Sequence, residues 1–113
     1  MLITVLQAKL RHAVVTAADP EYKGSITIDQ DIMDKMGVIP YQVCDVNQKG
    51  ENGIRTRTYI IPGERGSGCV ECNGALAYHI KEGDVVHINV YSQIWKHESS
   101  IHEPVIIETN VKK

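Results

Sequence analysis

The sequence contains no phenylalanine and a single tryptophan, Trp95, among its 113 residues. A hydrophobic core must therefore be built from aliphatic side chains and methionine, with help from five tyrosines. β-Branched and aromatic residues favour strands, so this composition is typical of a β-barrel or a β-sandwich. A chain of this length is long enough for a buried core, and we expect residues 1–113 to form a single domain.

The sequence also lacks a large excess of charge and any long apolar run. Twelve Lys and Arg residues stand against fourteen Asp and Glu residues, which gives a net charge of −2. Such a balance provides no broad attraction to nucleic acid or to anionic lipid. No apolar stretch approaches the roughly 20 residues of a membrane-spanning helix, and the first ten residues do not resemble a signal peptide. We therefore expect a cytoplasmic protein with a small-molecule ligand and with neither a nucleic-acid nor a membrane partner.

Cysteine is scarce, with Cys44, Cys69 and Cys72 alone. Three cysteines cannot all form disulfides with one another, and reduced thiols fit the cytoplasm. Cys69 and Cys72 have the C-x-x-C spacing of some zinc and redox sites, but a zinc site would need two further ligands and the five histidines show no ligand spacing. Positions 69 and 72 of a strand also point to opposite faces. We expect no metal site and two buried thiols.

Short apolar segments rich in β-branched residues alternate with turn residues along the chain, which predicts a mainly β fold. One helix is expected at 30–36, with Asp29 as its N-cap and Gly37 as its C-cap, and a second helical turn near 75–80. The last four residues, "NVKK", resemble a frayed tail. Many short strands with one or two short helices indicate a small closed barrel. The predicted strands are 2–7, 11–17, 25–28, 41–47, 54–61, 69–72, 84–91 and 104–108.

Gly24 and Ser25 form a pair directly before one of these strands. Alone, the pair is typical of an ordinary turn. It is also the pair that self-cleavage requires, because the Ser25 hydroxyl can attack the open Gly24 carbonyl in an N-to-O acyl shift. Elimination from the ester then breaks the chain and leaves dehydroalanine, which hydrolyses to a pyruvoyl group. Such a ketone forms a Schiff base with an amine and withdraws electrons, which suits amino-acid decarboxylation.

Motifs on both sides of this pair are similar to those of one known family. The sequence resembles the bacterial aspartate 1-decarboxylases, pyruvoyl-dependent enzymes that make β-alanine for pantothenate. This resemblance implies a double-psi β-barrel that assembles as a homotetramer, with active sites between subunits and cleavage into residues 1–24 and 25–113. It leaves open whether a maturation factor is needed. The motifs, which cover residues 1–92, are "ML", "AKL", "VVTAADPEYKGSITID", "NGIRTRTYIIPGERGSG", "CNGALA" and "EGDVVHINVY".

The resemblance also implies roles for individual residues. Ser25 is the precursor of the pyruvoyl group, Gly24 is its partner in cleavage, and Tyr22 helps to hold their turn. Thr58 matches the threonine needed for self-cleavage, and Tyr59 matches the tyrosine that protonates the carbanion after CO2 leaves. Thr58 and Tyr59 should lie on opposite faces of a strand, so we expect one of them to act from a bulge or through another subunit.

Substrate binding is assigned in the same way. Lys9 and Arg55 match family residues that contact substrate carboxylates, and a guanidinium can bind a carboxylate through two parallel hydrogen bonds. Without the resemblance, both would be read as solvated surface charges. The loop that holds the cofactor and the substrate matches Asn73, Gly74 and Ala75, although Asn-Gly alone indicates only a turn.

The sequence departs from the usual family pattern in three places. Arg11 and His12 stand in reversed order, and on a regular strand this exchange would turn the imidazole to the opposite face and bring Arg11 to the pocket side. Leu76 replaces a smaller alanine, and Arg57 adds a charge between Arg55 and Tyr59. These differences leave two alternatives open: a pyruvoyl decarboxylase of another amino acid such as glutamate, and a non-catalytic barrel that is never cleaved. The role of residues 93–113 is also left open.

Overall fold

The computed structural model describes residues 1–111, which form eight strands, one α-helix and two 3-10 helices. None of the helices in this range is long and apolar enough to cross a membrane. The elements in chain order are β1 (Leu2–Val14), β2 (Ala17–Asp19), β3 (Ser25–Asp29), α1 (Gln30–Met36), β4 (Val43–Gln48), β5 (Arg55–Gly63), β6 (Val70–Asn73), η1 (Gly74–Tyr78), β7 (Val85–Trp95), η2 (Lys96–Ile101) and β8 (Val105–Ile107).

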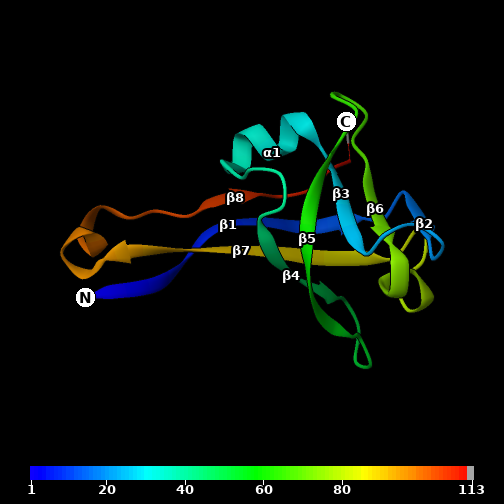
Figure 1. Ribbon diagram of the computed structural model, residues 1–113, viewed down its shortest axis with the longest axis horizontal. Helices are drawn as coiled ribbons and strands as arrows, with labels where there is room; N and C mark the ends of the chain where they lie inside the picture. The colour runs from blue at the N-terminus through cyan, green and yellow to red at the C-terminus, as the bar shows by residue number, and fades with distance from the viewer. Residues whose placement is uncertain (112–113) are drawn as a thin grey trace.

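The strands join in the order β2-β6-β3-β5-β4-β7-β1-β8. Three neighbouring pairs are parallel (β2 with β6, β3 with β5, β1 with β8), and the other four are antiparallel. Strands that are distant in the sequence therefore lie side by side around one core (Figure 1). The prediction of a mainly β, small barrel is confirmed, and its mixed pairing agrees with the double-psi barrel that the resemblance implies.

The core forms from alternate residues of these strands, as period-2 burial requires. Ile26 and Ile28 of β3 and Ile60 of β5 are completely buried. Helix α1 adds Ile32, Met33 and Met36 to this core. The helix has the predicted bounds and caps, because the Asp29 side chain accepts a hydrogen bond from the Asp31 amide at 2.8 Å and Gly37 adopts a φ of 70°.

Strand β1 is one continuous strand where the sequence predicts two, 2–7 and 11–17. Its register with β7 shifts between Leu6 and Ala8 and again between Leu10 and Ala13. Such bulges interrupt the alternation of apolar residues without ending the strand. The first part of β1, the end of β7 and η2 project from the body of the molecule (Figure 1). Neither the three-residue β2 nor η2 is predicted from the sequence.

The chain after β8 returns to β1 through Asn110, which is 5% exposed. Its side-chain oxygen accepts from the Val14 amide at 2.7 Å, and its side-chain nitrogen donates to the carbonyls of Val14 at 3.0 Å and Gly68 at 2.7 Å. The expectation that "NVKK" is a frayed tail is therefore wrong at Asn110, because these bonds anchor it. Lys112 and Lys113 lie outside the described residues.

Replacing Asn110 with alanine should lower the free energy of unfolding by about 2–4 kcal/mol, because three backbone groups lose their partner in a largely buried place. Denaturant-induced unfolding measures this change. Glu108→Ala is the matched control, since it removes an exposed ion pair with Arg11 and should change stability by less than about 1 kcal/mol. Equal losses in the two variants would contradict this account of the tail.

Candidate active site

Strand β3 lies between β5 and β6, and its register places Ser25 among polar side chains. Ser25 pairs with Asn73 of β6, and Ile26 pairs with Ile60 of β5. Because β3 and β5 are parallel, Ser25, which precedes Ile26, lies beside Tyr59, which precedes Ile60. Paired residues of neighbouring strands project to the same side of a sheet. Because Ile26 and Ile60 face the core, Ser25, Asn73 and Tyr59 face away from it.

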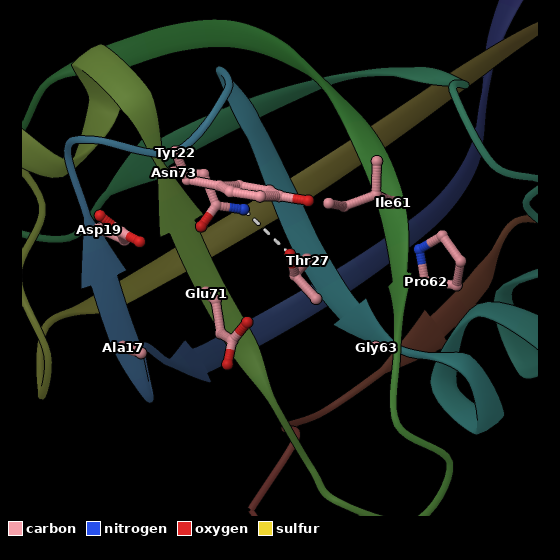
Figure 2. A pocket seen from close by; sticks show the side chains of 9 residues that line it. All are labelled: Ala17, Asp19, Tyr22, Thr27, Ile61, Pro62, Gly63, Glu71 and Asn73. Carbon is pink, nitrogen blue, oxygen red and sulfur yellow. Dashed lines mark hydrogen bonds between the residues drawn. The ribbon is translucent and has the colours of Figure 1, made fainter.

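A pocket of about 450 Å³ opens on this outer face (Figure 2). It lies over β2, β6, β3 and β5, and the side chain of Tyr22 reaches across it above Thr27. Its two carboxylates come from Asp19 and Glu71, and no lysine or arginine among residues 1–111 lines it. The lining residues are Ala17, Asp19, Tyr22, Thr27, Ile61, Pro62, Gly63, Glu71 and Asn73.

Ser25 is 1% exposed, and its hydroxyl is held from two sides. Its Oγ donates to the Lys23 carbonyl oxygen at 3.3 Å and accepts from Nδ2 of Asn73 at 3.0 Å. The same Nδ2 donates to Oγ1 of Thr27 at 3.0 Å. The direction of the Ser25 hydroxyl is therefore fixed, and the preceding Gly24 is exposed.

Gly74 packs directly against the turn that carries Gly24. A Cβ atom on Gly74 would lie 2.7 Å from Cα of Gly24 and 3.2 Å from the carbonyl oxygen of Tyr22, and Gly74 has a φ of 72°. Both features require glycine at this position. Ala75 follows as an exposed residue of η1. Tyr22, Gly24, Ser25, Asn73 and Gly74 thus come together in one corner of the fold.

Thr58 and Tyr59 lie on opposite faces of β5, as alternation predicts. Thr58 pairs with the buried Cys44, so it is on the core side. Tyr59 lies on the outer side, with its ring 6.0 Å from that of Tyr41 between centroids. Gly24 lies in the turn before β3, outside the strand pairing. Within one chain, the register therefore brings Tyr59, and not Thr58, to the side of β3 on which Ser25 lies.

Lys9 and Arg55 do not line the pocket beside Ser25. Arg55 lies at the start of β5, in a second hollow that also includes Asp45 and Tyr91. Lys9 is on β1, which is separated from β3 by β7, β4 and β5. With strands about 4.8 Å apart, four spacings keep Lys9 far from Ser25 along the sheet. A single chain therefore assembles the residues around Ser25 without these two cations.

Comparison with known proteins assigns the chain to a family. A family model described as aspartate decarboxylase matches residues 1–113. The chain is 45% identical over 108 residues to the aspartate 1-decarboxylase of Ruminiclostridium cellulolyticum, with 95% of this chain and 83% of the relative covered. The enzyme of that name from Bacillus subtilis is 43% identical over 110 residues, with 97% and 86% covered. The enzyme of that name from Neisseria meningitidis is 45% identical over 108 residues, with 95% and 84% covered.

The chain belongs to the aspartate decarboxylase family. The resemblance inferred from its motifs is thereby confirmed.

Each of the three departures from the family motifs has a local partner outside the pocket. Leu76 packs against the hydrophobic core. Nε of Arg57 donates to Oδ1 of Asp45 at 2.9 Å, and this guanidinium holds the pKa of the Asp45 carboxyl below its usual range. Nη1 of Arg11 lies 3.1 Å from Oε2 of Glu108. None of the three side chains lines the pocket beside Ser25.

The reversed order of Arg11 and His12 falls in a bulge of β1. Leu10 pairs with Ile88 and Ala13 pairs with Val86, so Arg11 and His12 both stand opposite His87. The expectation that the exchange turns the imidazole to the opposite face rests on a regular strand, and strict alternation does not hold at a bulge. His12 has a φ of 42°, and its amide donates to Nδ1 of His87 at 3.1 Å.

Three polar residues of the pocket, Asp19, Thr27 and Glu71, are not among the site residues predicted from the sequence. Thr27 and Glu71 are register partners on β3 and β6, two positions from Ser25 and Asn73 respectively. Strand alternation could have indicated them, because positions 25 and 27 share a face, as do 71 and 73. What the sequence did not supply was the pairing of β3 with β6.

The cysteines lie apart from this chemistry. Burial raises the pKa of Cys44 and that of Cys72 to about 12, so both thiols keep their protons at neutral pH. Cys69 is only half-buried, so the expectation of two buried thiols in the C-x-x-C pair holds for Cys72 alone. In the part of the chain that is described, no three His, Cys, Asp or Glu side chains are grouped to hold a metal ion.

Gly74→Ala should destabilise the fold more than Gly83→Ala. Both glycines have positive φ, but a Cβ on Gly83 meets nothing within 4 Å, whereas one on Gly74 meets the backbone of Gly24. The Gly83 variant should lose about 1–2 kcal/mol of unfolding free energy from backbone strain. The Gly74 variant should lose about 1–3 kcal/mol more from overpacking. Urea unfolding of the two variants checks this, and equal losses would contradict the close contact.

His87 should make stability depend on pH. Burial, then the nearby charges of His12, Lys9, Arg11 and Lys49, lower the His87 pKa from its ordinary 6.5. The unfolded chain therefore binds the proton more readily. The stabilisation that neutral His87 contributes is complete above about pH 6.5 and is lost as pH falls through the lower folded pKa. Protonation at Nδ1 also removes the acceptor for the His12 amide.

His87→Asn tests this dependence, because an asparagine oxygen can accept the same amide hydrogen without titrating. Unfolding measured between about pH 7.5 and pH 5 should show a smaller loss of stability for the variant than for the wild type. An identical loss in both proteins would show that His87 does not contribute.

Proposed function

We propose that this chain is a pyruvoyl-dependent decarboxylase that converts L-aspartate to β-alanine and CO2 for pantothenate biosynthesis. Membership of the aspartate decarboxylase family supports the reaction class. The observation that carries the proposal is the environment of Ser25, whose buried hydroxyl is held by Asn73 beside the Gly24–Gly74 contact. This arrangement suits formation of the cofactor from the chain itself.

The cofactor forms by cleavage of the bond between Gly24 and Ser25. Oγ of Ser25 bonds to the Gly24 carbonyl carbon, the carbon–nitrogen bond breaks, and the nitrogen of residue 25 takes up the hydroxyl proton. Loss of the Cα proton and of the Cβ–Oγ bond releases residues 1–24 as a carboxylate. Water then replaces the nitrogen of the dehydroalanine, and ammonia leaves. We assign Thr58 of β5, which matches the family threonine needed for self-cleavage, as the donor to the oxyanion.

The residues present fit a pyruvoyl group at position 25. The space beside Gly24 is open because Gly74 has no Cβ, and the Asn73 amide, which now bonds Oγ of Ser25, can donate to a ketone oxygen. The pyruvoyl group supplies an electron-withdrawing ketone. Tyr59, level with residue 25, is assigned as the proton donor to the substrate carbon after CO2 leaves, because a phenol O–H can act as a general acid. Tyr22 and Ala75 border the substrate.

We also propose that the complete site lies between subunits of a homotetramer. The pocket beside Ser25 has two carboxylates and no lining cation among residues 1–111, so a dicarboxylate substrate needs cations from elsewhere. Lys9 and Arg55 of neighbouring copies are assigned this role. Exposed apolar side chains on the projecting arm and on β8 support contact between copies: Leu2, Trp95, Ile101, Val105 and Ile106. Three free cysteines support a cytoplasmic location.

The mass of the denatured protein tests self-cleavage. The wild type should give two fragments that divide after Gly24, with pyruvoyl at residue 25. Ser25→Ala should give one intact, inactive chain, because the attacking oxygen is absent. The chain offers a matched control in its second Gly-Ser pair, since Ser67→Ala removes an exposed serine that bonds the Glu64 carbonyl and should leave cleavage unchanged.

Decarboxylation that persists in the Ser25→Ala variant would overturn the proposal. If the wild type stays intact, lysate of a related bacterium supplies any missing maturation factor, and a chain that remains intact after this addition is a barrel without the proposed chemistry. Initial rates with aspartate and glutamate separate the two substrates, with aspartate expected to be preferred.

A further inference from the structure

We propose that Thr27 is a positioning residue for cleavage of the Gly24–Ser25 bond and that it acts through Asn73. The inference rests on the proposed self-cleavage, and it assigns a residue that neither the motifs nor the cleavage chemistry identifies. Its basis is a connected set of contacts on the pocket side of β3, β6 and β5.

The Asn73 side chain is shared between two hydroxyl oxygens. Nδ2 of Asn73 donates to Oγ of Ser25 and to Oγ1 of Thr27, each at 3.0 Å. A side-chain amide has two N–H groups, so these two bonds use both of them. Figure 2 shows the bond from Asn73 to Thr27 across the floor of the pocket. Asn73 is 5% exposed and Thr27 is 7% exposed, so water has little access to replace either partner.

The bond to Thr27 fixes the rotation of the Asn73 amide. With one bond alone, the amide could turn about its side-chain torsion and leave the Ser25 oxygen. Competing acceptors are close, because Asp19 is the register partner of Asn73 on β2 and the Glu71 carboxylate lines the same pocket. Thr27 thus keeps the amide on Ser25 and away from these carboxylates.

Thr27 is itself held by its neighbours. A Cβ on Gly63, the glycine of β5 beside β3, would lie 2.9 Å from Cγ2 of Thr27. The methyl group of Thr27 and the thiol of Cys69, whose Sγ would lie nearer still to that Cβ, therefore share the space that Gly63 leaves open. A β-branched side chain has few allowed rotamers, and this packing favours the one that directs Oγ1 to Asn73. The positions of Gly63, Thr27, Asn73 and Ser25 are linked in this order.

Thr27→Val keeps the shape of the side chain and removes the acceptor. Self-cleavage of the newly made chain should slow by about fivefold to tenfold, as expected when one buried hydrogen bond no longer orients the amide. Thr27→Ser restores the hydroxyl and should cleave within about twofold of the wild type. The measurement is the fraction of intact chain against time on a denaturing gel, with thermal unfolding of each variant recorded in parallel.

A double-mutant cycle separates positioning through Asn73 from a general effect on structure. In an Asn73→Ala background the amide is absent, so adding Thr27→Val should not slow cleavage further. An equal slowing in both backgrounds overturns the proposal, and so does unchanged cleavage of Thr27→Val beside a wild type that cleaves. A wild type that stays intact even with added lysate removes the proposed function and this inference together.

Discussion

The pairing of β3 with β6 on one side and with β5 on the other is the constraint on which the candidate active site depends. Ile26 and Ile28 are completely buried between these strands, and their burial sets the register. A slip of β3 by one residue would exchange the two faces of the strand and turn Ser25 from the pocket side to the hydrophobic core. The hydrophobic side of β3 therefore determines where its polar side meets Asn73 and Tyr59.

The chain contains two Gly-Ser pairs, and only their surroundings distinguish them. Ser67 is exposed and bonds the Glu64 carbonyl in the loop between β5 and β6. Ser25 is buried and accepts from a side-chain amide that β6 brings from 48 residues away. The reactivity that we assign to the Gly24–Ser25 pair thus comes from strand pairing, since the same dipeptide at 66–67 lies in a loop between strands.

Sequence signals were sufficient to predict elements whose form depends only on residues nearby in the chain. The bounds of α1 follow from Asp29 and Gly37, because each cap acts within its own turn. The features that the sequence analysis missed or predicted wrongly depend on pairing between segments that are distant in the chain. The bulge at Arg11 and His12 exists only against β7, Asn110 is ordered only by β1 and Gly68, and Thr27 joins the site only because β6 lies beside β3. The family motifs identified the residues around Ser25, but they could not predict the strand register that brings these residues together.

Strand β1 lies inside the sheet, between β7 and β8, and β2 lies against β6. The bond between Gly24 and Ser25 is in the connection between β2 and β3, so breaking it would cut no paired strand. The short piece would keep its strands in the sheet, held to the longer piece by noncovalent contacts alone. Folding of the cut protein would then be an association of two chains, and its apparent stability would depend on concentration.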